Sequence, residues 1–290
     1  MDKIIATLEG CDYESKSKKK KAQTDMLMVD EISMVGGKIL SYLAYIKQRL
    51  PRIRFIVAGD IPHQLPPVKE ENRNFNDAYC LKEICGFNYV KLNYNFRMNT
   101  TKDELWDNWS CNPNQFKIDR GNKPTQRNLC YTNLTRKKVI QAIQDTIKNP
   151  RVLVCHNIRD FQSVEGQTKE LKIGMGTPLI ARKSIKDLEI AKNEMYYVCG
   201  LKEGFVELYE PELKKNIEVE DADILRWFLS GYCITIHKSQ GETYKDKYTI
   251  WEWARLSEPQ QDYYKENFYR RLRYVAQSRS TDPINNIYYR

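Results

Sequence analysis

Two short apolar runs on either side of a helical pattern constrain the fold of this 290-residue chain more than any other feature. Met26–Val29 and Ile53–Ala58 have the length of buried strands, and each ends in acidic residues. Between them, apolar residues recur at helical spacing over residues 36–50, and Pro51 stops the pattern. Strand, helix and strand of these lengths predict a βαβ unit with parallel strands. The acidic residues are then expected at the carboxyl edge of the sheet, where ligands of open α/β sheets bind.

A second α/β pattern follows a polar stretch at residues 99–125, where a domain boundary is expected. The pattern predicts strands and a helix at Leu129–Tyr131, about 134–148 and Arg151–Cys155. Thr132 or Asn133 is the expected helix cap. Residues 172–220 then change to short β-like runs separated by Gly, Lys and acidic residues, typical of a small barrel or β-ribbon. After that segment the sequence predicts a helix from Ser257 or Pro259, a basic helix into Tyr274–Ser278 and a C-terminal strand.

Composition narrows the class of protein. The net charge of +9 fits a protein that binds a polyanion, although a basic protein without a nucleic-acid role has the same charge. The lysine-rich residues 14–24 predict a solvated loop, a localisation signal or a DNA contact. Eight scattered cysteines without a C-x-x-C pair, beside three histidines, argue against zinc and predict reduced, mostly buried thiols. No apolar run is long enough for a membrane span and the N-terminus lacks the features of a signal peptide, so an intracellular location is expected.

Two acidic and polar segments follow the predicted strands. In Val29-Asp30-Glu31, one carboxylate could hold Mg²⁺ through its waters and the next could polarise a water that attacks a γ-phosphate. Capping of a helix is the alternative. Thirty residues later, Gln64 in the loop 59–68 could hydrogen-bond the γ-phosphate or the attacking water, and two prolines would stiffen its exit. The alternative is a proline-rich surface turn.

These segments carry a family resemblance. VDEISMV and GDIPHQLPPV resemble motifs II and III of the superfamily 1B DNA helicases, in particular the petite-integration-frequency group, with RecD as a more distant relative. This chain has one extra residue in motif III, His63. Further matches follow in the family's order: LNYNFR at 92–97 is similar to motif IV, ITIHKSQGET at 234–243 to motif V, and YVAQSRS at 274–280 to motif VI. Gln277 stands where the family often has Leu.

The resemblance implies an α/β fold of two RecA-like parallel-sheet domains, with ATP and Mg²⁺ as cofactors. It assigns residues 25–115 to a partial first domain, which is truncated at its N-terminus, after a basic lead-in at 1–24. Residues 125–290 form the second domain, with a β-rich insertion at about 172–222. The implied partner is single-stranded DNA or a DNA junction, and the implied activity is unwinding with 5′-to-3′ travel, in DNA replication and repair. The lysine-rich style resembles proteins of large DNA viruses, so a nucleus and a viral replication compartment both remain open.

The same resemblance assigns roles to individual residues. For the nucleotide these are Asp30 on Mg²⁺ through water, Glu31 as the base, Gln64 as γ-phosphate sensor, Arg97 and Arg279 as arginine fingers, and Gly241 and Glu242 near the nucleotide. For the DNA strand they are Thr235, His237, Lys238 and Ser239. The turn at 131–136 resembles a strand-to-helix turn whose helix N-terminus either holds a DNA phosphate or is a plain cap.

One family motif is missing. The P-loop, G-x-x-x-x-G-K-[ST], does not occur in the 290 residues, and Gly36-Gly37-Lys38 lacks its first glycine and its hydroxyl residue. We expect Gly36 and Gly37 to open the helix after motif II. Three alternatives follow: a helicase fragment whose P-loop is on an upstream segment or a separate polypeptide, a non-hydrolysing DNA-binding or assembly module, or an unrelated basic α/β protein.

Overall fold

The computed structural model describes residues 24–68, 70, 78–86, 88–98, 100–101, 105–119, 124–154 and 170–290. The lysine-rich residues 14–23 lie outside these ranges. The chain divides into two compact units. Unit 1 comprises Met1–Asn112 with Pro259–Val275, and unit 2 comprises Pro113–Glu258 with Ala276–Arg290. Residues 259–275 therefore belong to unit 1, whereas the sequence placed them with the second domain.

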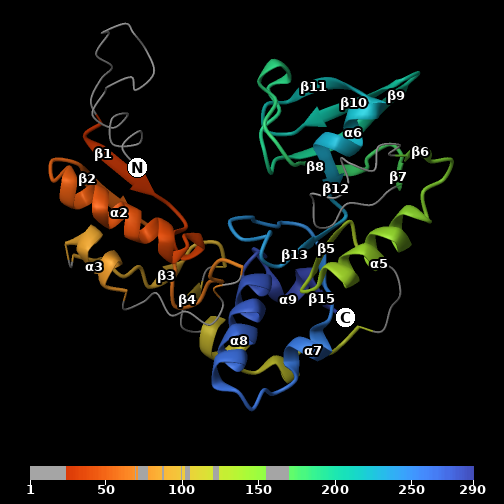
Figure 1. The fold of residues 1–290 in the computed structure, drawn as a ribbon. Coiled ribbons are helices and arrows are strands. Elements are labelled where there is room, and N and C mark those ends of the chain that lie inside the picture. The colour runs from red at the N-terminus through yellow and green to blue at the C-terminus, as the bar shows by residue number, and fades with distance from the viewer. Residues whose placement is uncertain are drawn as a thin grey trace, which may run out of the picture. The chain divides into compact units, whose positions relative to one another are not determined.

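Unit 1 contains the predicted βαβ unit (Figure 1). Its elements are β1 (Met26–Val29), the 3₁₀ turn η1 (Ile32–Met34), α2 (Gly37–Arg49), β2 (Arg54–Val57), α3 (Tyr79–Cys85), β3 (Tyr94–Asn95), β4 (Thr100–Thr101), the π-helix η2 (Leu105–Ser110) and most of α8 (Tyr263–Gln277). Strands β1 and β2 are parallel, with Met26 opposite Arg54 and Val29 opposite Val57. The prediction of parallel strands around a helix is confirmed.

The burial of these two strands differs from the prediction. Helix α2 packs on one side of the pair, where Ile46, Leu50 and Ile53 are buried with Leu27 and Phe55 beside them. On the strands, Met28 is 72% exposed and Ile56 is 46% exposed. The prediction that both strands are buried is therefore wrong. The reason is that β1 and β2 pair only with each other among the described residues, whereas a parallel sheet is normally covered on both faces.

Unit 2 contains a four-stranded parallel sheet in the order β13-β5-β14-β15. The elements of this part are η3 (Pro113–Gln115), β5 (Arg127–Cys130), α5 (Asn133–Gln144), β13 (Cys233–Thr235), β14 (Tyr248–Ile250), α7 (Trp253–Ser257), α9 (Pro283–Asn286) and β15 (Ile287–Tyr289). Thr132 caps α5, as predicted, and the helix ends at Gln144 rather than near residue 148. The predicted C-terminal strand is β15, which pairs with β14.

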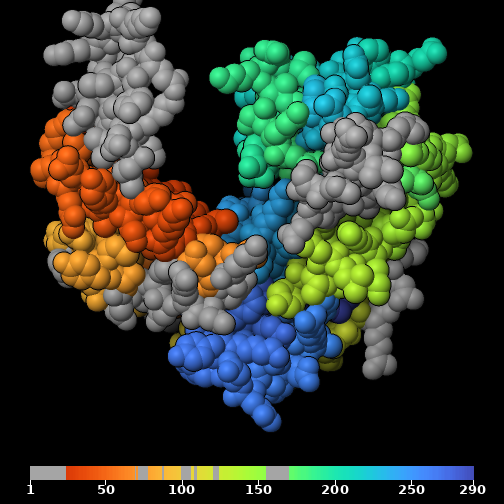
Figure 2. Space-filling view, viewed as in Figure 1, coloured from red at the N-terminus to blue at the C-terminus, as the bar shows by residue number. Residues whose placement is uncertain are grey.

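An antiparallel sheet is inserted between α5 and β13. It has the order β11-β10-β9-β8-β12, and its elements are β8 (Pro178–Ala181), η5 (Lys186–Leu188), β9 (Met195–Lys202), β10 (Phe205–Glu210), β11 (Lys215–Glu220), α6 (Asp221–Trp227) and β12 (Phe228–Ser230). These elements form one continuous block in the space-filling view (Figure 2). The β-rich character that the sequence predicted for this segment is confirmed.

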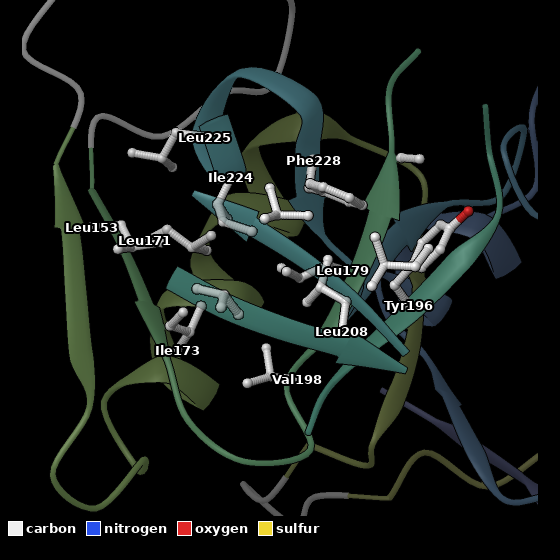
Figure 3. Close-up of a cluster of buried hydrophobic side chains, with 14 of the residues drawn as sticks. Leu153, Leu171, Ile173, Leu179, Tyr196, Val198, Leu208, Ile224, Leu225 and Phe228 are labelled. Carbon is white, nitrogen blue, oxygen red and sulfur yellow. The ribbon is translucent and has the colours of Figure 1, made fainter. Parts of the chain in front are cut away.

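A separate two-stranded sheet, with one strand outside the predicted bounds of the insertion, shares the core of the inserted sheet. Strand β6 (Arg151–Val154) pairs antiparallel with β7 (Glu170–Ile173). Leu153 of β6 joins Leu171 and Ile173 in the same core as the inserted sheet, around Leu208 and Phe228 (Figure 3). The sequence predicted the strand at 151–155 correctly but read it as part of the α/β pattern. Its partner β7 is antiparallel, and the β6–β7 pair packs into the core of the insertion instead.

Three further expectations concern the whole chain. Among the described residues, no helix is long and apolar enough to cross a membrane. No group of His, Cys, Asp or Glu in the described part of the chain is arranged to hold a metal ion. Of the described cysteines only Cys130 and Cys233 are buried, while Cys111 is exposed, so the expectation of mostly buried thiols is wrong. Cys11 and Cys155 lie outside the described residues.

Candidate functional site

The acidic pair directly follows β1. Ile32 N–H donates to the carbonyl oxygen of Ala58 over 3.0 Å, which holds the chain after β1 against the end of β2. Glu31 has a left-handed backbone, φ 51° and ψ 46°, a conformation uncommon in residues other than glycine and concentrated at functional sites. Asp30 is exposed, and its Oδ1 accepts from Glu31 N–H at 2.8 Å. Both carboxylates therefore lie at the carboxyl edge of the β1–β2 pair, as predicted for them.

The two segments that resemble motifs II and III are joined by a direct hydrogen bond. Ser33 Oγ donates to Gln64 Oε1 at 2.8 Å, and Ser33 is buried. Gly59 has φ 152°, and a Cβ at this position would lie 2.8 Å from the backbone nitrogen of Ile32. Glycine is therefore needed for the loop to pass this close to η1. Leu65 is fully buried, which excludes a loose surface turn as the description of this loop.

The extra residue of motif III is accommodated by packing. His63 Nδ1 lies 2.8 Å from Asp60 Oδ1. The His63 ring lies 4.5 Å from the ring centroid of Trp106 in η2 and 5.5 Å from that of Tyr274 in α8. Tyr274 in turn donates its hydroxyl to Asp60 Oδ2 at 3.3 Å. All four residues belong to unit 1, so the inserted histidine ties the motif III loop to α8.

Helix α8 holds the same loop through a residue that sequence reasoning missed. Arg271 is buried, and its Nη1 reaches the carbonyl oxygen of Gln64 at 3.5 Å. Burial lowers the pKa of the Arg271 guanidinium, and the nearby Asp60 carboxylate opposes that shift. Basic residues on a helix usually face solvent, so the sequence pattern carried no signal for this contact.

The segment Gly36-Gly37-Lys38 lies at the N-terminus of α2. Gly36 is the N-cap and Gly37 the first helical residue, so the two glycines open the helix as expected. Gly37 N–H donates to Glu70 Oε2 at 3.1 Å, and a Cβ on Gly36 would lie 2.7 Å from Glu70 Oε1. A carboxylate thus occupies the place at this helix end that a phosphate would need.

Arg97 lies in the turn after β3. Its backbone N–H donates to Asn95 Oδ1 at 3.0 Å, which closes the turn. The neighbouring ring of Phe96 is 89% exposed and packs edge-on against Tyr94 at 4.9 Å. The structure thus explains the local conformation of Arg97, and its contact with a nucleotide stays a prediction.

The motif V residues form a tight turn after β13. Lys238 N–H and Ser239 N–H both donate to the carbonyl oxygen of Thr235, at 2.9 and 3.1 Å. Ser239 is fully buried and its hydroxyl donates to the carbonyl oxygen of Ile236 at 2.9 Å, so this side chain stabilises the turn. His237 and Lys238 are half-buried on the same turn. Gly241 has φ 87° and faces open space.

The motif VI arginine is bonded to that turn. Arg279 is 2% exposed, and its Nη1 donates to the carbonyl oxygens of Ser239 at 3.4 Å and Glu242 at 3.3 Å. Its Nη2 donates to Ser278 Oγ at 2.8 Å. The structure therefore brings together Ser239, Glu242 and Arg279, which the sequence assigned to the second domain. It also gives Arg279 a structural role that the sequence did not predict.

A second missed residue, Glu252, decides between the alternatives for the turn at 131–136. Glu252 Oε2 accepts from the backbone N–H groups of Tyr131 and Thr132, both at 2.9 Å, and Oε1 accepts from Thr132 Oγ1 at 2.9 Å. Thr132 Oγ1 also accepts from Thr135 N–H at 3.2 Å. The start of α5 is thus a protein-capped helix end. No local signal links Glu252 to this turn, because 120 residues separate it from Thr132.

Comparison with known proteins bears on the fold. By sequence, the chain matches no protein-family model and no curated protein. By structure, it is similar to the Pif1 helicase from Candida albicans, with a TM-score of 0.61 and 17% identity over 92% of this chain and 72% of that one. It is also similar to Pif1 helicase from Bacteroides, solved in complex with ADP-AlF3 and single-stranded DNA, with a TM-score of 0.58 and 18% identity over 98% and 78% of the two chains. The chain therefore has the mixed α/β fold of the Pif1 DNA helicases over nearly its whole length.

Proposed function

We propose that this chain is the motif II to motif VI portion of an ATP-dependent superfamily 1B DNA helicase, which moves 5′-to-3′ on single-stranded DNA and unwinds duplex. The observation that carries the proposal is the Ser33–Gln64 hydrogen bond at the carboxyl edge of the β1–β2 pair. It joins the two segments that a nucleoside-triphosphatase of this kind uses on the γ-phosphate side. The structural similarity to Pif1 helicases supports it.

The residues present fit one end of a bound Mg²⁺–ATP. An exposed Asp30 carboxylate is a suitable ligand for a hydrated Mg²⁺, which would neutralise phosphate charge. Glu31 would accept a proton from the attacking water, and Gln64 would orient that water. The residues present do not fit the other end, because the 290 residues contain no P-loop and the N-terminus of α2 holds the Glu70 carboxylate. ATP hydrolysis by this chain therefore requires a P-loop from an upstream segment or from a separate polypeptide.

The DNA-binding part of the proposal rests on the motif V turn. His237 and Lys238 lie half-buried after β13, at the carboxyl edge of the parallel sheet. Burial lowers the pKa of the Lys238 ammonium group. A desolvated cation in this place suits a phosphate of single-stranded DNA. The Bacteroides relative was solved with single-stranded DNA, which supports the assignment.

A second candidate is a non-hydrolysing module that binds single-stranded DNA or assembles on it. The 290 residues contain no G-x-x-x-x-G-K-[ST] motif, and the only Gly-Gly-Lys step begins a helix whose end already holds a carboxylate. In such a non-hydrolysing module, the DNA-binding residues would act without nucleotide hydrolysis, and Glu31 would have no catalytic role.

Two measurements separate the candidates. The first is binding of a fluorescent oligothymidylate to the chain at low and moderate salt. The second uses a fusion in which the P-loop segment of Bacteroides Pif1 is placed before residue 24, and it measures nucleotide binding and DNA-stimulated ATPase activity of this fusion. The helicase proposal expects DNA binding by both proteins and turnover by the fusion that Glu31→Gln abolishes. A fusion that binds an ADP analogue and DNA without turnover favours the module. Absence of DNA binding at low salt would overturn both.

A further inference from the structure

The loop that carries Gln64 is one residue longer than the motif III that it resembles, and the extra residue is part of a wide turn. Gln64 N–H donates to the carbonyl oxygen of Asp60 at 2.9 Å, so the turn spans five residues with His63 as the fourth. Leu65, the next residue, is fully buried and anchors the exit of the turn. The backbone position of Gln64 is therefore set by a turn that includes the inserted histidine.

Three neighbouring side chains hold the ring of His63. Its Nδ1 donates to Asp60 Oδ1 at 2.8 Å, and the Tyr274 hydroxyl donates to Asp60 Oδ2 at 3.3 Å. The His63 ring centroid lies 4.5 Å from that of Trp106 and 5.5 Å from that of Tyr274, and these two rings are 5.5 Å apart. The side chain of His63 is only 13% exposed. The ring therefore fills an aromatic pocket, and the bond to Asp60 fixes its orientation there.

Two arginines of α8 fix the Trp106 wall of this pocket. Arg270 Cζ lies 3.9 Å from the Trp106 ring centroid, and Arg270 Nη2 donates to the Trp106 carbonyl oxygen at 3.2 Å and to Asp107 Oδ1 at 3.0 Å. The buried Arg273 donates through Nε to the carbonyl oxygen of Ser110, at the end of the same π-helix, over 2.6 Å. Helix α8 and η2 thus form one packed wall against the motif III turn.

Gln64 itself is held at its side chain and at its carbonyl group. Ser33 Oγ donates to Gln64 Oε1 at 2.8 Å, and Arg271 Nη1 donates to the Gln64 carbonyl oxygen at 3.5 Å. One planar peptide unit joins His63 to Gln64, so a shift of the His63 ring out of its pocket must move the Gln64 backbone. The two consecutive side chains therefore restrain each other, one in the aromatic pocket and one beside Ser33.

We propose that His63 is a positioning residue, which fixes Gln64 for contact with the γ-phosphate of a bound nucleoside triphosphate. It touches no substrate itself and acts through Gln64, because its anchored ring holds the turn between the aromatic pocket and Ser33. This role deepens the proposed function and rests on it. A displacement of about 1 Å in a positioned group can remove most of its contribution to turnover. Loosening this turn should therefore lower turnover more than it lowers nucleotide binding.

The test is a double-mutant cycle between positions 63 and 64 in the fusion that carries a P-loop segment before residue 24. The kcat and KM for ATP are measured for the unmodified fusion, His63→Ala, Gln64→Ala and the double variant. Affinities for ADP and for ADP with aluminium fluoride, which adds a mimic of the γ-phosphate, give a readout that is independent of turnover. Ile84→Val is the matched control, because it removes one methylene from a buried side chain of the same unit. Urea unfolding measures the stability of each variant.

We expect His63→Ala to lower kcat about tenfold while KM stays within about twofold. It should also weaken binding of the aluminium fluoride complex about tenfold and leave ADP affinity within about twofold. In the Gln64→Ala background the same substitution should change kcat less than about twofold, because a residue that acts through Gln64 then has nothing to position. His63→Asn keeps a donor for Asp60 and His63→Phe keeps the ring, so each should recover part of the loss, also where His63→Ala does not fold. Ile84→Val should lower stability and keep kcat.

The cycle separates a positioning role from a purely structural one. Additive effects of His63→Ala and Gln64→Ala on kcat would overturn the positioning role, and so would an unchanged kcat in His63→Ala. Equal weakening of ADP and its aluminium fluoride complex would overturn it too and leave His63 as a structural residue. A fusion that binds nucleotide without turnover refutes the proposed hydrolysis alone, and the two affinities then decide the role of His63. A fusion that binds neither nucleotide complex refutes the proposed function and this role together.

Discussion

Ser33 Oγ donates a 2.8 Å hydrogen bond to Gln64 Oε1, across 31 residues of sequence. The bond fixes the side-chain amide of the proposed γ-phosphate sensor relative to the turn that carries Asp30 and Glu31. The catalytic assignment of Gln64 therefore depends on a serine that has no catalytic task itself.

Removal of this hydroxyl should destabilise unit 1. Ser33→Ala leaves the side-chain amide oxygen of Gln64, Oε1, without this donor in a part-buried place. We therefore expect a loss of about 1 kcal/mol in the free energy of unfolding. Urea unfolding followed by circular dichroism measures it. Ser41→Ala is the control, because Ser41 is exposed and its hydroxyl donates to the carbonyl oxygen of Gly37 within its own helix. Equal effects of the two substitutions would show that the Ser33–Gln64 bond carries no stability.

Gly59 should tolerate no side chain. In Gly59→Ala, the new Cβ would lie 2.8 Å from the backbone nitrogen of Ile32 at a φ of 152°, so the motif III loop must move. We expect a cost of about 2 kcal/mol or more. Gly204→Ala, at φ 73° with nothing within 4 Å, isolates the backbone strain and should cost about 1 kcal/mol. If thermal melts show the same loss for both variants, the close contact between motif III and η1 is not present in solution.

Replacement of Arg279 should unfold the motif V turn before it tests an arginine finger. Arg279→Ala leaves the carbonyl oxygens of Ser239 and Glu242 without this donor in a buried place, for which we expect a loss of about 2–4 kcal/mol. Chemical denaturation measures the loss. Arg226→Ala is a suitable control, since Arg226 is exposed and pairs with Asp223 three residues earlier in the same helix. A fully stable Arg279→Ala protein would contradict the structural role and make its loss of activity a direct test of catalysis.

Alkaline pH should destabilise unit 2. Burial raises the pKa of Tyr248 well above its ordinary value near 10, and its hydroxyl donates to the carbonyl oxygen of Ala276 at 2.7 Å. Below pH 10 the tyrosine is protonated in both states, so its contribution is fully present. As pH rises above 10, the unfolded chain loses the proton and the folded chain keeps it, so stability falls.

The measurement is the unfolding free energy between about pH 8 and pH 11. Tyr248→Phe should be less stable at neutral pH, because the hydrogen bond is lost, and should show a shallower decline at high pH. Tyr264→Phe, at an exposed position, is expected to follow the unmodified chain. A decline that Tyr248→Phe leaves unchanged would assign the alkaline sensitivity to other groups.

The sequence predicted helices and strands well where residues close together in the sequence determine them. The spacing of apolar residues around Ile46 and Leu50 predicts α2, because hydrophobic periodicity reports which face is buried. Short β-like runs between Gly, Lys and acidic residues predict β8 to β11. The motif residues were found for a different reason, since short fixed strings such as the motif V turn need no knowledge of distant contacts. Burial was harder to predict: β1 and β2 look like interior strands, yet Met28 is exposed, because burial depends on what else covers the sheet.

The amino-acid sequence by itself determined the βαβ unit, the β-rich insertion and the candidate nucleotide and DNA residues, and it limited the cap of α5 to Thr132 or Asn133. Tertiary structure alone decided the partners across long separations: Ser33 with Gln64, Glu252 with Thr132, and β6 with β7. The physical reason is that side-chain hydrogen bonds and strand pairing depend on positions in space. Periodicity and motif spacing describe only neighbours along the chain, so they leave those partners open.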